Sequence, residues 1–288
     1  MNKTPSLLRS ALFVPSSEQK RIDKATTIPA DAIIFDLEDA VAPSEKSRAR
    51  DLLVAALTSG AFANRQLIVR VNGLNSPWFE DDMIAIKKAG CCDVMLPKCE
   101  SSADIQRVRE VLTAPDTRIF ALIETAMGVL SVKDIAAALN SSEALCFGHV
   151  DFAADMGLST ADASVGIIHH ARCQVVLAAK ANGLLAIDNV CTDVKDETLI
   201  KEDTLAGKNL GYTGKLCVHP HQVAIINAVY TPSDEQVARA NALLSAWDEA
   251  QSRGLGAIQF ENKMVDLPVI QAQQAILERY KLAQLKDE

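Results

Sequence analysis

Two segments, RIFALIETAMGVL (residues 118–130) and EALCFGHVDFAADMG (residues 143–157), decide the fold of this chain. They contain two short apolar runs, Ile119–Ile123 and Ala144–Phe147, separated by a stretch of helical length. Each run leads to an acidic residue, Glu124 after the first and Asp151 after the second, and small residues follow both acids. Such breaks mark the change from strand to loop. The pattern therefore predicts two parallel strands with a carboxylate beyond each carboxyl end.

These two carboxylates predict a metal site. Burying a carboxylate is costly unless a partner compensates its charge. Two such groups at the ends of neighbouring strands cannot both ionise without a cation between them. Mg²⁺ prefers oxygen ligands and usually keeps positions open for a substrate. We therefore interpret Glu124 and Asp151 as a metal-binding pair, while the alternative, two acids that cap helix N-termini, stays open at this point.

Apolar runs recur along the chain and alternate with segments of helical pattern. Near-continuous apolar strands that alternate with amphipathic helices are typical of a covered parallel sheet. Eight such units within residues 1–230 predict a (β/α)₈ TIM barrel of the α/β class. An open doubly wound sheet is the competing fold, but it would usually carry a Gly-rich phosphate-binding turn after an early strand, and the sequence shows none. The predicted strands are residues 11–14, 32–35, 67–71, 94–96, 119–123, 144–147, 184–187 and 216–218.

Polar or charged residues follow nearly every predicted strand. In a barrel the carboxyl ends of all strands converge on one mouth, where catalytic groups collect. Some of these residues should instead pair with one another at the rim, and we expect this above all for Asp36, Lys98 and Asp188. The residues at the strand ends are Pro15, Asp36 with Glu38 and Asp39, Arg70 with Asn72, Lys98, Glu124, Asp151, Asp188 and His219.

Residues 231–288 follow a different pattern from the preceding chain. A break at Thr231-Pro-Ser233 precedes a predicted helix over 237–253, glycines at 254 and 256 end it, and a polar loop leads to a last helix over 268–284. A segment of this size has too small a core to fold alone. We therefore expect residues 231–288 to form a C-terminal helical extension that packs as a lid on a barrel mouth. The specific expectation is that this barrel belongs to a neighbouring subunit.

Composition excludes several classes of function. The 288 residues are 49% hydrophobic with a net charge of −8, and their Lys and Arg residues are scattered, which argues against nucleic acid binding. No run approaches the ~18 apolar residues of a membrane span, and the N-terminus lacks the apolar core of a signal peptide. The seven cysteines include no C-x-x-C pair, which favours a reduced, cytoplasmic protein without a zinc site.

An arginine, a pair of lysines and the histidines are further candidates for functional residues. Arg70, in LIVRVN, could bind a carboxylate or an enolate oxygen with its planar fork, or it could form a buried ion pair with Glu38 or Asp39. Lys20 and Lys24 share one face of a predicted helix and could hold phosphate groups, although solvated lysines would show the same spacing. The histidines show no metal-ligand pattern.

Motifs spread over the chain resemble those of the citrate lyase β-subunit-like (CitE-like) family, in the HpcH/HpaI aldolase and malyl-CoA lyase superfamily. The matching stretches are RSALFVP, IIFDLEDAVAPSEKSRAR, LIVRVN, DVMLPKCES, ALIETAMGV, FGHVDFAADMG, GKLCVHPHQV and GAIQFENKMVDLP. The resemblance implies the (β/α)₈ fold and a Mg²⁺-dependent lyase. Members of this family cleave a 3-hydroxyacyl thioester into an acetyl thioester and a 2-oxo acid.

The resemblance also implies roles for individual residues. It makes Glu124 and Asp151 the Mg²⁺ ligands, Arg70 the substrate-binding arginine, and Asp266 a tail acid that closes over a neighbouring barrel and handles the substrate proton. Glu124, Arg70 and Asp266 would form the catalytic set of a homo-oligomer, commonly a trimer. The positions implied to contact coenzyme A are Phe13, Lys20, Lys24, Leu216 and Cys217.

The chain departs from the family pattern at two positions, and its resemblance to the family allows several activities. The family usually has glycine at the position of Ser16, and the serine side chain is expected to narrow the approach to the phosphate-binding turn. The family also usually has glycine at the position of Asn262, but asparagine tolerates positive φ, so the turn is expected to survive. We favour a lyase acting on citramalyl-CoA or malyl-CoA. The alternatives are a citrate lyase β subunit acting on a citryl-acyl-carrier protein, a thioesterase or malate-synthase-like enzyme, and a catalytically inactive binding subunit.

Overall fold

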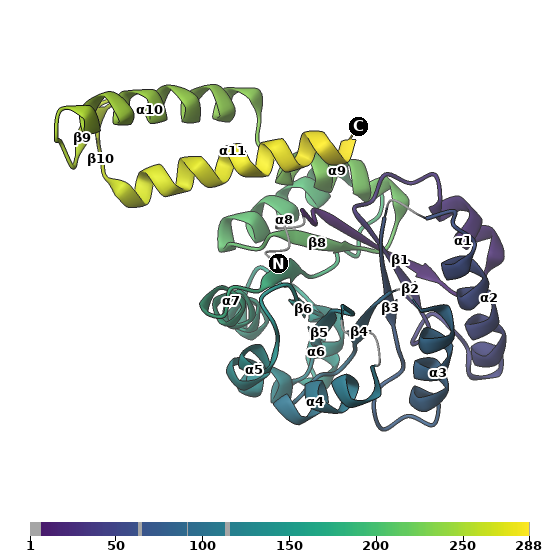
Figure 1. Ribbon diagram of the computed structural model, residues 1–288. Coiled ribbons are helices and arrows are strands. Elements are labelled where there is room, and N and C mark those ends of the chain that lie inside the picture. The colour runs from purple at the N-terminus through teal and green to yellow at the C-terminus, as the bar shows by residue number, and fades with distance from the viewer. Residues whose placement is uncertain (1–6, 63–64, 91, 113–115, 288) are drawn as a thin grey trace. The chain divides into compact units, whose positions relative to one another are not determined.

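The computed structural model describes residues 7–62, 65–90, 92–112 and 116–287. The chain divides into two compact units (Figure 1). Residues Leu8–Asn227 form the larger unit, and the smaller unit contains the residues from Ala228 onward. The boundary lies within helix α9 (Pro220–Tyr230). Each unit is described by itself.

The larger unit is a closed barrel of eight parallel strands in sequence order, with β1 paired to β8. This confirms the predicted barrel, and each predicted strand agrees with an observed one to within two residues at either end. The strands are β1 (Ser10–Pro15), β2 (Ala32–Asp36), β3 (Gln66–Arg70), β4 (Asp93–Leu96), β5 (Ile119–Ile123), β6 (Ala144–Phe147), β7 (Leu185–Asp188) and β8 (Gly214–Cys217).

Helices cover the outer face of the barrel (Figure 1). Local sequence fixes their first turns. Ser101 and Asp104 form a capping box at the start of α4 (Ser102–Val111), and the Thr125 side chain accepts a hydrogen bond from the Gly128 N–H in the first turn of α5 (Ala126–Ala138). The helices are α1 (Gln19–Ala25), the 3₁₀ helix η1 (Pro43–Glu45), α2 (Lys46–Thr58), α3 (Phe79–Ala89), α4 (Ser102–Val111), α5 (Ala126–Ala138), α6 (His149–Asp155), α7 (Gly166–Ala181), α8 (Glu197–Leu210) and α9.

Apolar side chains fill the interior of the barrel. All residues of β2, β4, β5, β6 and β8 are buried, as expected for strands covered on both faces. The interior is therefore a packed core. The central cluster comprises Leu8, Ala11, Ala32, Ile34, Ile68, Met95, Phe120, Leu122, Ala144, Cys146, Ile187 and Leu216.

The smaller unit is a helical hairpin with a β-hairpin at its turn. Helices α10 (Asp234–Ser252) and α11 (Leu267–Asp287) lie side by side, and β9 (Ile258–Phe260) pairs with β10 (Lys263–Val265) at one end (Figure 1). The prediction of a polar loop was therefore wrong, because two short strands can pair there. Their two-residue turn places Glu261 at φ 48° and Asn262 at φ 61°, the left-handed geometry that a tight hairpin needs. The expected tolerance of Asn262 for positive φ is confirmed.

Two expectations from composition also bear on the structure. Across the described residues, no helix combines the length and apolar character required to span a bilayer. Cys99, Cys146 and Cys217 are free thiols buried in the core, where cysteine acts as a small apolar residue.

Candidate active site

One cavity, of about 680 Å³, opens at the carboxyl ends of the strands. Its wall combines acidic, basic and apolar side chains from segments far apart in the sequence, because parallel strands bring all their carboxyl ends to the same face. Most of the predicted site residues meet here. Those that line it are Phe13, Lys20, Lys24, Arg70, Glu124, Asp151 and Leu216.

The predicted metal pair lies on neighbouring elements. Strands β5 and β6 pair in register, with Ile123 opposite Phe147, and Glu124 directly follows β5. Asp151 lies one turn beyond the end of β6, in the first turn of α6, and not at the strand end itself. Neither acid caps a helix, because Thr125 is the N-cap of α5 and Gly148 that of α6. The alternative interpretation as capping residues is therefore excluded.

The Lys98 backbone and Gly148 together define the position of the Glu124 carboxylate. Its Oε1 accepts a hydrogen bond of 2.9 Å from the Lys98 N–H. A Cβ on Gly148 would lie 2.5 Å from Oε2 and 2.8 Å from the Glu124 Cβ, so only glycine leaves room for this side chain. Gly148 is thus a functional position that the sequence analysis overlooked, although its place directly between β6 and the acid-bearing helix α6 was a signal.

The electrostatics of Glu124 favour the binding of a cation. The side chain is only 2% exposed. Burial, followed by the negative charges of Asp151 and Glu38, raises the pKa of Glu124 to about 8. Within the described part of the chain, neither Glu124 nor Asp151 forms an ion pair. A divalent ion would compensate both charges.

The donor set fits Mg²⁺. Among the residues that the structure describes, no group of three or more His, Cys, Asp or Glu side chains is arranged to hold a metal. Mg²⁺ is usually bound by one or two carboxylates and completes its shell with water and substrate oxygens. Glu124 and Asp151 supply that minimal set.

Arg70 is both a cavity-lining residue and an ion-pair partner. It ends β3 opposite Asp36, the last residue of β2. Its Nε and Nη2 donate to the Asp36 carboxylate at 2.8 and 2.7 Å, and its Nη1 lies 3.1 Å from Glu38 Oε2. The ion pair considered as an alternative therefore exists, with Asp36 as its main partner. It orients the guanidinium at the cavity wall.

The Phe13 ring lies under this guanidinium, with a distance of 4.8 Å from Arg70 Cζ to the ring centroid. Phe13 therefore supports Arg70 as well as lining the cavity. Burial disfavours the charge on Arg70, but the carboxylates of Asp36, Glu38 and Glu124 together outweigh that effect and raise the pKa of the guanidinium. Its positive charge is therefore permanent at any pH that the protein meets.

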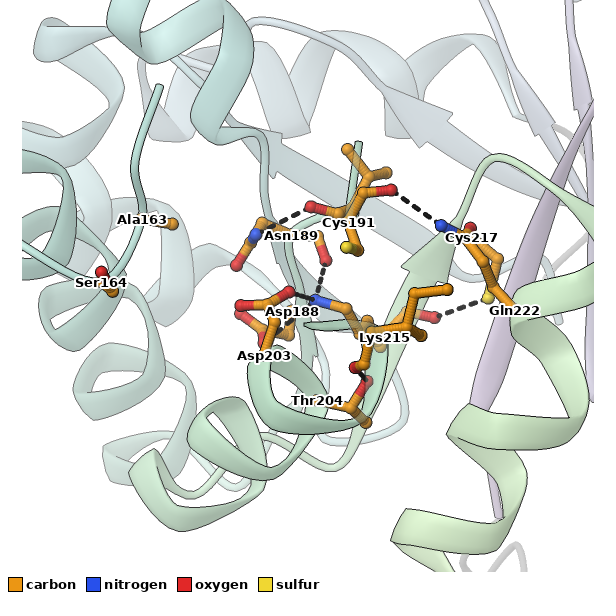
Figure 2. A network of polar contacts seen from close by, with 12 residues as sticks. Ala163, Ser164, Asp188, Asn189, Cys191, Asp203, Thr204, Lys215, Cys217 and Gln222 are labelled. Atoms are coloured by element: carbon orange, nitrogen blue, oxygen red, sulfur yellow. Dashed lines mark hydrogen bonds and ion pairs between the residues drawn. The ribbon is translucent and has the colours of Figure 1, made fainter. Parts of the chain in front are cut away.

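The expected rim pairs are present. Asp36 binds Arg70, Lys98 binds Glu38, and Asp188 binds Arg172. The last pair belongs to a buried network, in which Lys215 also reaches Asp188 and Asp203 (Figure 2). The side chains of this network, Arg172, Asp188, Asp203 and Lys215, are not part of the cavity wall.

His149 is a site residue that the sequence analysis treated too lightly. It lines the cavity, is 5% exposed, and its Nδ1 has no hydrogen-bond partner among the described residues. Burial, assisted by the positive charge of Lys215, lowers the pKa of His149 to about 4. Its imidazole is therefore neutral at pH 7.

Three predicted positions behave differently from the rest. Cys217 is fully buried, and its thiol lies against the Lys215 carbonyl, so its side chain is not part of the cavity wall although that of Leu216 is. Ser16 is also buried, with its N–H donating to the Asp36 carbonyl, and it does not narrow the cavity as expected. Asp266 lies in the smaller unit, half-buried between β10 and α11. Its catalytic role stays a prediction.

Comparison with known proteins gives one consistent family. The model of the HpcH/HpaI aldolase/citrate lyase family matches residues 9–220. A protein named (3S)-malyl-CoA thioesterase, from Cereibacter sphaeroides, is 35% identical over 93% of both chains. A citrate lyase subunit beta-like protein from Deinococcus radiodurans is 36% identical, over 96% of this chain and 99% of that protein.

Solved structures agree with these matches. The structure of CitE from Mycobacterium tuberculosis in complex with magnesium, acetoacetate and coenzyme A has a TM-score of 0.82 and 32% identity, and the match covers 96% of this chain and 99% of that one. The fold, the motifs and the overall sequence lead to the same conclusion: this chain belongs to the HpcH/HpaI aldolase/citrate lyase family.

Proposed function

We propose that this protein is a Mg²⁺-dependent carbon–carbon lyase that cleaves a 3-hydroxyacyl-CoA thioester, of the citramalyl-CoA or malyl-CoA type, into acetyl-CoA and a 2-oxo acid. One observation carries the proposal: a single cavity contains two carboxylates that form no ion pair among the described residues, a fixed arginine and a face of basic residues. These three features match the acid end, the reacting carbon and the phosphates of such a substrate. Relatives named lyases and thioesterases of malyl-CoA support the same substrate class.

The acid end of the substrate would lie at Glu124 and Asp151. Mg²⁺ bound to these two carboxylates would supply a Lewis acid and a template for the carboxylate and hydroxyl oxygens of the substrate. The raised pKa of Glu124 supports this, since a carboxyl that is neutral without a cation becomes a ligand when it loses its proton. The Lys98 N–H then stabilises the ionised carboxylate.

The reaction moves one proton away from the hydroxyl group and one onto carbon. Loss of the hydroxyl proton allows a carbonyl to form at C3, and the bond between C2 and C3 breaks. The electron pair remains on C2 as a thioester enolate, and Arg70 would stabilise its negative charge. A group placed in this way can contribute roughly 10²–10³ in rate, as an oxyanion donor does. Protonation of C2 completes the acetyl group.

The thioester end would follow the basic wall of the cavity. Lys20, Arg21 and Lys24 all lie along it, on helix α1. Lysines and arginines bind phosphates by charge and hydrogen bonds. Phe13 and Leu216 provide apolar surface nearby. Coenzyme A carries both phosphates and apolar parts, which favours it over a substrate without a nucleotide.

Asp266 is the candidate acid for the final proton transfer. It follows the hairpin β9–β10, and its neighbours Met264 and Leu267 are 77% and 53% exposed. Exposed apolar residues around a carboxylate suit a segment that covers another surface. We propose that this segment closes over the barrel of a neighbouring subunit in a homo-oligomer, a trimer by the resemblance to the family.

A direct assay tests the proposal. The purified protein should release acetyl-CoA and pyruvate from citramalyl-CoA, or acetyl-CoA and glyoxylate from malyl-CoA, in the presence of Mg²⁺, and chelation of the metal should stop the reaction. A Glu124→Ala variant that retains full Mg²⁺-dependent cleavage would contradict the assignment. Activity only after addition of an acyl-carrier protein would favour the citrate lyase β subunit.

Hydrolysis is the second candidate function, favoured by the 35% identity to proteins named (3S)-malyl-CoA thioesterase. In that reaction water attacks the thioester carbonyl and the carbon skeleton stays intact. A thiol assay combined with chromatography of the acyl products separates the two. Free coenzyme A with intact malate identifies a thioesterase, and acetyl-CoA with glyoxylate identifies a lyase.

A further inference from the structure

Lys98 has an unusual backbone conformation for its residue type. Its φ is 48°, which lies in the left-handed region. This region is unfavourable in free energy for any L-residue that carries a side chain. Among the described residues other than glycine, only Glu261 and Asn262 share a positive φ, and the two-residue hairpin turn that they form requires it. No such hairpin surrounds Lys98, which follows β4 at the cavity end of the barrel. Strained residues that no turn explains cluster at functional sites.

The conformation lets a single residue bind two acids. The Lys98 N–H donates to Glu124 Oε1 at 2.9 Å, and its ammonium donates to Glu38 Oε1 at 2.7 Å. The other oxygen of Glu38 lies 3.1 Å from Arg70 Nη1. Lys98 therefore connects the carboxylate proposed to bind the metal with the arginine proposed to bind the enolate.

We propose that Lys98 is a positioning residue that fixes the metal-binding carboxylate and the arginine relative to each other. The proposal rests on the function proposed above, in which these groups act on neighbouring parts of one substrate. Such chemistry demands a fixed geometry, because small misplacements of reacting groups lower rates strongly. The backbone arm acts on Glu124, and the ammonium arm acts on Arg70 through Glu38.

The two arms belong to different parts of the residue and can be separated by substitution. The backbone arm needs only a residue that tolerates positive φ. Asparagine does so without supplying a cation, whereas valine, which is branched at Cβ, strongly resists that region. Arginine retains the cation and has the same backbone preference as lysine. The series Lys98→Arg, Lys98→Asn and Lys98→Val therefore tests the arms one by one.

The primary measurement is Mn²⁺ affinity, determined without substrate by titration calorimetry or electron paramagnetic resonance. The second measurement is steady-state kinetics, which gives kcat and KM separately. Loss of an outer-shell partner typically weakens metal affinity roughly 10–100-fold, and we expect this for Lys98→Val. Lys98→Asn should keep its Mn²⁺ affinity within about threefold while its kcat/KM falls roughly tenfold. Lys98→Arg should stay close to wild type in both.

Thermal unfolding and circular dichroism establish that each variant is folded, and Lys88→Asn, an exposed substitution on α3, serves as the control for loss of one lysine charge. Equal Mn²⁺ affinities of the folded Asn and Val variants would overturn the backbone arm. Wild-type kcat/KM in Lys98→Asn would overturn the ammonium arm. If the wild-type protein itself bound no Mn²⁺, the proposed function would fail, which is a separate outcome.

Discussion

Substitution of Glu124 by glutamine should stabilise the metal-free protein at alkaline pH. Glu124 is almost fully buried beside Asp151, and within the described residues it forms no ion pair. Glutamine has nearly the same shape, and its carbonyl oxygen can still accept the hydrogen bond from the Lys98 N–H. It cannot ionise, however. The variant therefore removes an unfavourable charge and leaves no cavity.

The magnitude follows from the change in pKa on folding. The ordinary value of 4.5 becomes about 8 in the folded protein, mainly through burial. Because the folded state holds this proton more tightly, the free energy of unfolding falls as pH rises from 4.5 to about 8 and is unaffected by this group below 4.5. At about 1.4 kcal/mol per pH unit, the full cost is about 5 kcal/mol. We expect the Glu124→Gln variant to gain roughly 3–5 kcal/mol at pH 8.5, or roughly 6–10 °C in Tm.

The assay is thermal unfolding of both proteins between pH 5 and pH 8.5 in the presence of a chelator. The two Tm values should agree at pH 5 and diverge as pH rises. Millimolar Mg²⁺ should then raise the Tm of the wild-type protein and leave that of the variant unchanged, because a ligand stabilises only the state that binds it. Asp39→Asn, an exposed change at the same mouth, is the matched control.

Parallel Tm curves for the two proteins across this pH range would refute the reasoning. That result would mean that the Glu124 carboxylate ionises in the folded state without a cost. A Mg²⁺-dependent rise in Tm of equal size in the variant would show that the ion binds elsewhere.

Further predictions concern the rest of the barrel. Gly148→Ala should weaken Mn²⁺ affinity by roughly tenfold or more with the fold retained, because its Cβ would meet the Glu124 carboxylate, and calorimetry checks this. The apparent Mg²⁺ affinity of the wild-type protein should rise about tenfold per pH unit up to about pH 8, with release of about one proton per ion, measured by calorimetry in two buffers. Arg70→Lys should lower kcat/KM by roughly 10²–10³ and leave Mn²⁺ affinity unchanged, because lysine cannot replace the planar fork. Arg172→Met should cost roughly 3–5 kcal/mol in urea unfolding, because it leaves Asp188 buried without its main partner.

Much of the fold and part of the site could be read from local sequence. Apolar runs such as Ile119–Ile123, alternating with helical segments, specify a parallel barrel because burial on both faces requires them. Once the strands are parallel, their carboxyl ends must meet, so the proximity of Glu124, Asp151 and Arg70 follows from topology alone. The capping box of α4 and the tolerance of Asn262 for positive φ are equally local.

Tertiary structure decided which groups became partners. Asp36 binds Arg70 because strand register places them opposite each other, and the residue types alone also allowed Glu38 or Asp39. The left-handed conformation of Lys98 and the burial of His149 depend on contacts between segments far apart in the chain. Sequence patterns report which residues are apolar and how they are spaced, whereas the pairing of charges depends on distances of a few ångströms that only the packed barrel sets.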